Sequence, residues 1–210
     1  MSLFRKMLAQ LRSFLRVQET VPFSIRGEVD ITARDRAGTV FFQEQHKNVI
    51  LDQGKYKVAD ILRDTLANKV IGGTVLSLAR FAIGDGGAES TSLNTPKPVD
   101  KARTGLFREI RRLDITSHSK PDPNVIAFQV EILSDDLSAG DFNPANAGEY
   151  VNEAGLVLSV SGVLTDGNPN TGGTTDPAEV VFSHKTHKSI PFTPGQGIVI
   201  NYAWRIFVVM

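Results

Sequence analysis

Residues 198–209 have the sequence IVINYAWRIFVV, and this stretch decides the fold. An apolar side chain stands at every second position, which is the period of a β-strand. This set comprises Ile198, Ile200, Tyr202, Trp204 and Ile206. The segment Pro191-Phe-Thr-Pro-Gly195 precedes it and separates it from an earlier apolar run, because proline and glycine interrupt regular structure. The C-terminal segment is therefore predicted to be a long strand.

Similar patterns recur along most of the chain. Residues 23–31 alternate, the turn Asp35-Arg-Ala-Gly38 follows, and residues 39–45 return, which predicts a hairpin. One segment has helical spacing instead: Asp52 is a candidate N-cap, and the apolar stripe of an interior helix runs from Val58 to Asn68. Further strands are predicted at residues 76–83, 105–116, 125–133, 153–164 and 178–190.

These elements predict a mainly β protein, an antiparallel β-sandwich with one interior helix and an N-terminal amphipathic helical arm. A parallel α/β sheet would need a helix between successive strands. A chain of 210 residues can bury one sizeable core. We therefore assign residues 1–20 to the arm and residues 21–210 to the β-sandwich domain, in which residues 21–45 form a hairpin extension.

The first residues combine an apolar stripe with basic side chains. Residues 2–17 carry four basic and no acidic side chains, which fits a membrane-surface anchor, a presequence, an arm that docks on another protein, or a helix packed on its own domain. We predict a docking arm that lays its apolar stripe in a groove on a neighbouring protein. The predicted interaction residues are Leu3, Phe4, Met7, Leu8, Leu11 and Leu15.

Composition excludes several classes of protein. The formal net charge is zero, so no global field favours nucleic acid or anionic lipid. The absence of cysteine rules out disulfides and thiolate metal sites. No stretch approaches the roughly 20 consecutive apolar residues of a membrane-spanning helix. We expect no membrane span and no direct role with nucleic acid.

Few residue patterns suggest chemistry. His184 and His187 could share a metal on a helix, but positions three apart in a strand point to opposite faces. The segment Gly84-Asp-Gly-Gly87 lacks the lysine and hydroxyl residue of a phosphate-binding loop, which favours a tight turn. No Gly-x-Ser-x-Gly motif is present. We therefore predict no catalytic, cofactor-binding or metal-binding residues, and expect that the protein is not an enzyme.

Two other features point to assembly. Loops at residues 84–103, 134–150 and 165–177 exceed the usual length, and long loops are commonly functional or ordered by a partner. The basic stretch around Arg108, Arg111 and Arg112 lacks the interleaved aromatic side chains of a single-strand groove. Salt bridges between subunits are the preferred interpretation of these arginines.

Several short motifs together resemble small tail, collar and fibre-associated proteins of tailed bacteriophages. The resemblance covers roughly residues 46–208, and the motifs are short and degenerate. They are Asn48-Val-Ile-Leu-Asp-Gln-Gly54, Ala79-Arg-Phe-Ala-Ile-Gly-Asp-Gly86, Leu106-Phe-Arg-Glu-Ile110, Asn152-Glu-Ala-Gly-Leu156 and Phe182-Ser-His-Lys-Thr-His-Lys-Ser-Ile-Pro191, followed by the last strand.

This resemblance implies a β-sandwich building block of the virion, with no catalytic residues to carry over. The expected function is structural: a tail, neck, collar or baseplate component that forms a symmetric ring or trimer and connects neighbouring virion proteins or attaches fibres. Its expected location is the virion, assembled in the host cytoplasm. The alternative is a receptor- or glycan-binding β-sandwich that uses its long loops for recognition.

Overall fold

The computed structural model describes residues 24–56, 77–146, 148–159 and 180–209. This part of the chain is mainly β-structure, and every strand pairing in it is antiparallel. The strands are β1 (Ser24–Arg34), β2 (Val40–Ile50), β3 (Ser77–Gly84), β4 (Ala88–Glu89), β5 (Ser92–Pro96), β6 (Glu109–Asp114), β7 (Ser117–Asp122), β8 (Val125–Leu133), β9 (Tyr150–Ser159), β10 (Val180–Pro191) and β11 (Val199–Val209). Two short 3₁₀ helices follow β8, at Ser134–Asp136 and Ala139–Asp141.

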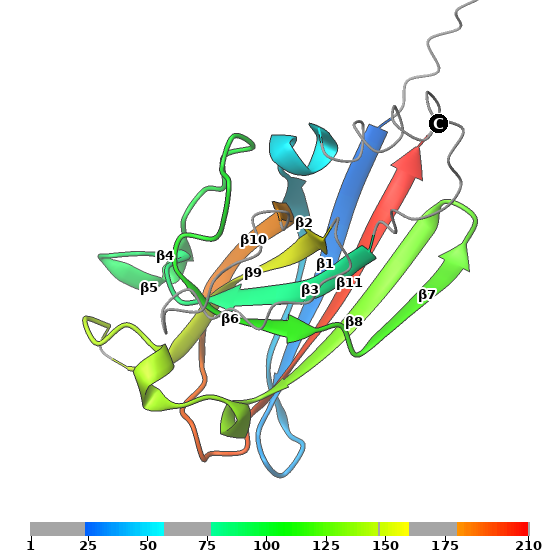
Figure 1. Ribbon diagram of the computed structural model, residues 1–210. Helices are drawn as coiled ribbons and strands as arrows, with labels where there is room; N and C mark the ends of the chain where they lie inside the picture. Colours follow the sequence, from blue (N-terminus) through cyan, green and yellow to red (C-terminus); the bar gives the residue numbers. More distant parts are fainter. Residues whose placement is uncertain (1–23, 57–76, 147, 160–179, 210) are drawn as a thin grey trace, which may run out of the picture.

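Nine strands form one curled sheet in the order β6-β3-β9-β10-β2-β1-β11-β8-β7, while β4 and β5 form a separate pair. Strand β2 changes its pairing partner along its length. It pairs with β1 through residues 40 and 42–48, with an irregularity at Phe41, and with β10 only at Val49 and Ile50. We call β1, β11, β8, β7 and the first part of β2 the first arm of the sheet, and β10, β9, β3 and β6 the second arm. In Figure 1, β3, β9 and β6 cross in front of β1, β11 and β8.

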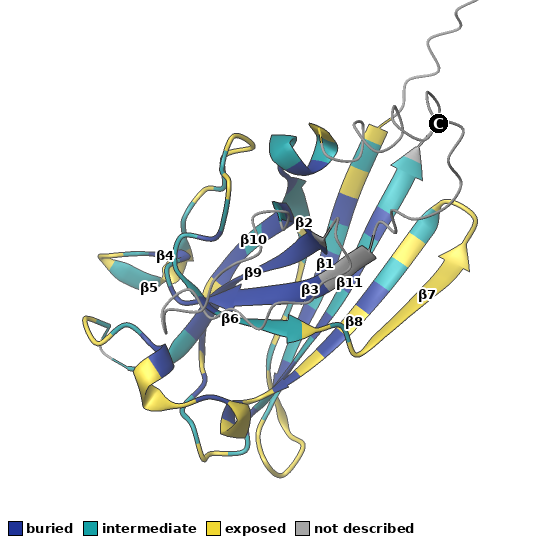
Figure 2. Ribbon diagram, viewed as in Figure 1, coloured by how far each residue is buried: buried dark blue, intermediate teal, exposed yellow. Residues whose placement is uncertain are grey.

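The main core lies between the two arms. The ring of Phe81 on β3 lies 4.9 Å from the ring of Tyr202 and 5.6 Å from that of Trp204, both on β11, measured between centroids. Along β1, β8 and β11 of the first arm, buried and more exposed residues alternate, as Figure 2 shows. This alternation follows from the opposite directions of successive side chains in a strand. The aromatic and branched side chains at alternate positions therefore hold the two arms together.

The second arm is also covered on its other face. A second apolar cluster joins Ala82 on β3, Val157 on β9 and Val181 on β10 to Leu51 and Leu106. Leu106 belongs to the long connection between β3 and β6, so this connection packs against the sheet. The loop at residues 84–103 is expected to be functional or ordered by a partner. It also has a contact within the chain, since the carbonyl oxygen of Lys97 accepts a hydrogen bond from Oγ1 of Thr186 on β10.

Several expectations can be compared with these elements. The predicted N-terminal hairpin is confirmed as β1 and β2, and these strands occupy central positions in the nine-stranded sheet rather than its edge. Residues 52–56 are helical, while the rest of the predicted interior helix and the N-terminal arm lie outside the described residues. Within the described ranges, no helix has the length and apolar character needed to cross a membrane.

Candidate functional site

A buried carboxylate on β9 lies at the centre of the candidate site. The side chain of Glu153 has no exposed surface, and its Oε1 accepts hydrogen bonds from the backbone N–H groups of Gly86 (3.1 Å) and Arg108 (2.7 Å). Its Oε2 accepts a bond from the backbone N–H of Phe107 (2.7 Å) and another from Nε2 of His184 (2.9 Å). A buried carboxylate needs such donors, because desolvation without them is strongly unfavourable. Glu153 therefore fastens two parts of the β3–β6 connection to the sheet.

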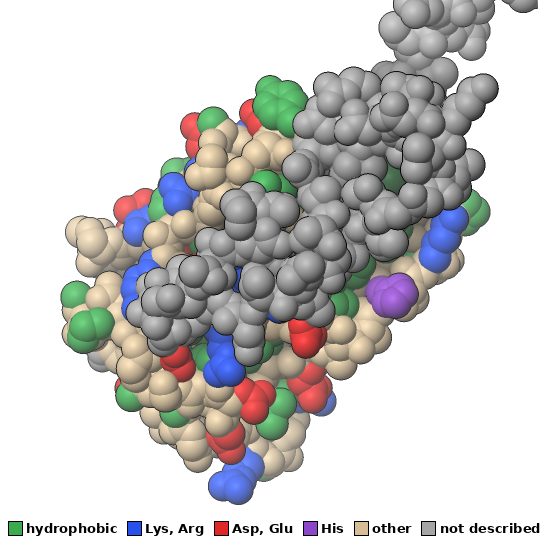
Figure 3. Space-filling model, in the orientation of Figure 1, with side chains coloured by type: hydrophobic (Ala, Val, Ile, Leu, Met, Phe, Trp, Pro, Cys, Tyr) green, Lys and Arg blue, Asp and Glu red, His purple; other side chains and the backbone are tan. Residues whose placement is uncertain are grey.

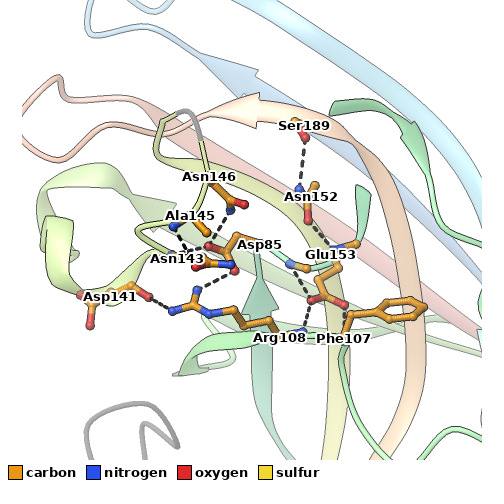
Figure 4. Close-up of polar contacts among 12 residues, drawn as sticks. Asp85, Phe107, Arg108, Asp141, Asn143, Ala145, Asn146, Asn152, Glu153 and Ser189 are labelled. Atoms are coloured by element: carbon orange, nitrogen blue, oxygen red, sulfur yellow. Dashed lines mark hydrogen bonds and ion pairs between the residues drawn. The ribbon is translucent and has the colours of Figure 1, made fainter. Parts of the chain in front are cut away.

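Asp85 forms a second junction beside Glu153. Its Oδ1 accepts a hydrogen bond from Nη1 of Arg108 at 2.6 Å, and its Oδ2 accepts bonds from the backbone N–H of Asn143 (2.7 Å) and from Nδ2 of Asn146 (3.2 Å). Nη2 of Arg108 also donates to the backbone carbonyl of Asp141 (3.2 Å). Figure 4 shows how these groups converge. Asp85 and Arg108 thus tie the segment that precedes β9 to the end of β3.

Asn152, the residue before Glu153, completes the junction. Its Oδ1 accepts a bond from the backbone N–H of Gly87 (2.7 Å), and its Nδ2 donates to Oγ of Ser189 on β10 (3.1 Å). A Cβ at Gly87 would lie 2.5 Å from the backbone oxygen of Asn152, closer than real Cβ contacts allow. The Gly84–Gly87 segment therefore lies close against β9, and the N–H groups of Gly86 and Gly87 are bonded to the side chains of Glu153 and Asn152. We call Asp85, Gly86, Gly87, Phe107, Arg108, Asn152, Glu153 and His184 the Glu153 network.

The two histidines of β10 are both buried but meet different partners. His184 meets Glu153, and its Nδ1 has no hydrogen-bond partner among the described residues. His187 meets the main core, where its Nε2 lies 3.0 Å from the hydroxyl oxygen of Tyr202 and its Nδ1 lies 2.8 Å from the carbonyl oxygen of Lys188. The two imidazoles do not come together. In the described part of the chain, no group of three histidine, aspartate or glutamate side chains is placed to hold a metal ion.

Burial shifts the pKa values of His187 and Tyr202, which are hydrogen-bonded in the main core. The pKa of His187 is lowered to about 4, first because burial penalises the charged imidazolium. Burial also raises the pKa of Tyr202, and the negative charge of Glu153 adds to that rise. Both groups are therefore neutral near pH 7, and they form a hydrogen bond between neutral side chains.

A pocket of about 580 Å³ opens beside the Glu153 network. Its lining includes Glu89 and Lys97 from the β4–β5 region, Phe107, and the side chains of Asn143 and Asn146. Nζ of Lys97 is held by the carbonyl oxygen of Gly86 (2.7 Å) and lies 5.1 Å from the centroid of the Phe107 ring. The guanidinium of Arg103 lies 3.7 Å from that centroid. The pocket thus combines amides, a carboxylate and an aromatic ring that two cations approach.

The basic residues singled out in the sequence form their contacts inside the chain. Arg108 pairs with Asp85, Arg112 pairs with Glu109 at 2.6 Å, and Arg111 donates to the carbonyl oxygen of Asp136. The interpretation of these arginines as salt bridges between subunits is therefore not needed to explain them. The predicted interaction residues of the N-terminal helical arm, Leu3 to Leu15, lie outside the described residues.

The sequence analysis missed the central role of Glu153. The sequence contained one signal for this role. Residues 151–158 are apolar except for Asn152 and Glu153, so Glu153 is an ionisable residue in an apolar strand. An ionisable residue in a buried strand requires a partner, since such residues are almost never fully buried alone. The identity of the partners was not readable, because the backbone N–H groups of Gly86 and Arg108 come from positions far along the chain.

Searches with this chain against protein-family models, curated proteins and solved structures gave no significant match.

Proposed function

We propose that this protein is a structural component of a tailed-phage virion, in the tail, neck, collar or baseplate. It oligomerises and connects neighbouring virion proteins or attaches fibres, and it has no catalytic activity. In this proposal the curled sheet acts as a β-sandwich building block. Its partners are further copies of itself in a symmetric ring or trimer and other phage proteins.

The observation that supports this proposal most is the convergence of the family-like motifs. Residues from Gly84-Asp-Gly-Gly87, Leu106-Phe-Arg-Glu109 and Asn152-Glu-Ala-Gly155 meet in the Glu153 network, together with His184. Their charged groups bond to one another and to backbone N–H groups. Residues that bond to one another in this way stabilise the fold, whereas catalytic residues would direct a reactive group toward a substrate.

The distribution of charge also favours contacts with protein over contacts with nucleic acid. On the face drawn in Figure 3, basic and acidic side chains are interspersed where the described residues form the surface. A nucleic-acid interface would concentrate lysine and arginine in one patch or stripe. The formal net charge of zero agrees with the mixed surface.

The decisive experiment is mass spectrometry and electron cryomicroscopy of particles purified from the phage that encodes this chain. We expect density for this fold in a symmetric ring or at the base of a fibre, with residues 2–17 against a neighbouring protein. A chain that is absent from purified particles would contradict the structural role.

The pocket favours a second candidate function, the binding of a receptor glycan. Sugar sites combine amide and carboxylate groups with an aromatic ring, and this pocket provides Asn143, Asn146, Glu89 and Phe107. A glycan array with the purified protein tests this function. Binding that Asn146→Ala abolishes, and that the control Gln129→Ala on β8 preserves, would support it. An array on which no glycan binds would contradict this second function.

A further inference from the structure

Strand β2 has an open edge in the first arm of the sheet. Its residues 40 and 42–48 pair with β1 on one side, with an irregularity at Phe41, and on the other side β10 pairs only with Val49 and Ile50. In an antiparallel strand half of the backbone N–H and C=O groups point to each side. Within the described part of the chain, no strand pairs with the second side of residues 40–48, although the side chain of Lys188 on β10 reaches Glu44 at 3.1 Å.

The open edge of β2 differs from the edge at the end of the first arm. Strand β7 is short, all six of its residues are exposed, and it includes Lys120 and Pro121, which discourage further pairing. Strand β2 is longer, has no proline, and begins with two exposed apolar side chains. Val40 is 50% exposed and Phe41 is 47% exposed. An edge of this kind normally receives a partner strand, because it is otherwise prone to association.

The sequence of β2 suits pairing with itself. A two-fold axis at Gln43 would pair residues 40–46 of two copies and would place Gln43 opposite Gln43, Phe42 opposite Glu44, and Phe41 opposite Gln45. No like charges face each other in this register. An axis at Glu44 would oppose two carboxylates, which is unfavourable. An axis at Gln45 would pair residues 42–48 and would leave the exposed Val40 and Phe41 outside the contact.

We propose that two copies of this chain associate through antiparallel pairing of their β2 edges, with the two-fold axis at Gln43. This inference deepens the assembly function proposed above by naming the partner at one surface. The contact is isologous, so each copy contributes the same residues. Strand addition of this type draws its affinity from backbone hydrogen bonds and its register from the side chains. The contact is smaller than a standard interface of roughly 1,600 Å², so the association is weak and depends on concentration.

The test introduces charged side chains at Gln43, on the two-fold axis. Sedimentation velocity of the full-length protein over a concentration series should show a reversible dimer. Gln43→Lys and Gln43→Glu each place two like charges opposite each other, and we expect each to raise the dissociation constant by about tenfold or more. An equimolar mixture of the two variants should recover association, and native mass spectrometry should show that the dimer contains one copy of each.

Two controls make the result specific. Gln129→Lys makes the same change at an exposed position of β8, which lies between β7 and β11, and should leave the dissociation constant unchanged. Equal thermal midpoints for all variants would show that they fold alike. A monomeric protein at every concentration, single variants that associate like the unmodified chain, or a mixture without heterodimer would each overturn the proposal. Because the assay uses purified protein, its outcome is independent of whether the chain is found in virions.

Discussion

The two faces of β10 hold buried histidines only three residues apart, but they stabilise the fold by different means. The face with His184 is polar: Glu153 on the neighbouring strand bonds to this imidazole and to three backbone N–H groups of the covering loop. The face with His187 is apolar, apart from the bond to the hydroxyl of Tyr202. The comparison teaches that polar groups fix the loop in place, while packing between the arms holds the core.

The largest effect should follow from the loss of the central carboxylate. Glu153→Ala leaves three backbone N–H groups and the Nε2 of His184 without their acceptor in a buried site. We expect the free energy of unfolding to fall by about 3–5 kcal/mol. Urea denaturation measures this change, and hydrogen exchange should show faster exchange at Gly86, Phe107 and Arg108.

Glu131 provides the matched control for this substitution. Its side chain is 48% exposed and lies 3.7 Å from Arg34 in a surface ion pair. Glu131→Ala should therefore change the free energy of unfolding by less than about 1 kcal/mol. Equal losses for the two variants would mean that the polar face does not depend on Glu153.

The next largest effect should be the pH dependence that His187 introduces on the apolar face. Its pKa in the folded protein is lowered to about 4 by burial, from 6.5, so the unfolded chain takes up the proton first as the pH falls. Stability is therefore complete above about pH 6.5 and decreases by about 3 kcal/mol as the pH falls to about 4. Denaturation at several pH values measures this slope.

Variants separate this contribution from the titration of carboxylates in the same range. His187→Gln removes the titrating group, so the difference in slope between this variant and the unmodified protein should account for the decrease between pH 6.5 and pH 4. The control His118→Gln changes an exposed histidine of β7 and should leave the slope in place. A slope that persists in His187→Gln would contradict the lowered pKa.

The fold was readable from the sequence where side chains alternate. The predicted strands at residues 125–133 and 198–209 coincide with β8 and β11 within a residue or so, because their buried positions recur with period two. Strand β7 was missed, since its sequence Ser-His-Ser-Lys-Pro-Asp has no apolar residue and pairing with β8 alone makes it a strand. The pair formed by β4 and β5 was missed because these strands are only two and five residues long.

The candidate site was less readable than the fold. The expectation that the two histidines of β10 lie on opposite faces agrees with their partners. The tight turn expected at Gly84–Gly87 is a bend at Asp85 between the end of β3 and the start of β4. The joining of Asp85 to Arg108 and of Glu153 to the loop depends on which strands become neighbours. That order is set by the packing of the two arms, so no local pattern encodes it.

A smaller effect should result from crowding the polar side of β9. Gly155 faces the covering loop, and a Cβ there would lie 2.9 Å from the carbonyl oxygen of Ser183 and 3.1 Å from Cδ1 of Leu106. Gly155→Ala should lower the free energy of unfolding by about 1–3 kcal/mol, because a well-packed layer must shift to accept the methyl group. Gly105→Ala is the control, since nothing lies within 4 Å of a Cβ at that position. Similar unfolding curves for both variants would show that the loop yields easily.

The last prediction involves no change of stability and distinguishes the two faces directly. The carbonyl of Lys188 can only accept, so Nδ1 of His187 carries the proton and Nε2 accepts from the hydroxyl of Tyr202. The carboxylate of Glu153 also only accepts, so Nε2 of His184 carries a proton. Nitrogen-15 correlation spectra of the imidazoles near pH 7 should therefore show a protonated Nδ1 in His187 and a protonated Nε2 in His184. If the same nitrogen is protonated in both rings, one of the two histidines does not make the hydrogen bonds described here. The variant Tyr202→Phe removes the donor to Nε2 of His187, so a changed spectrum of His187 in this variant would show that the bond to Tyr202 is present.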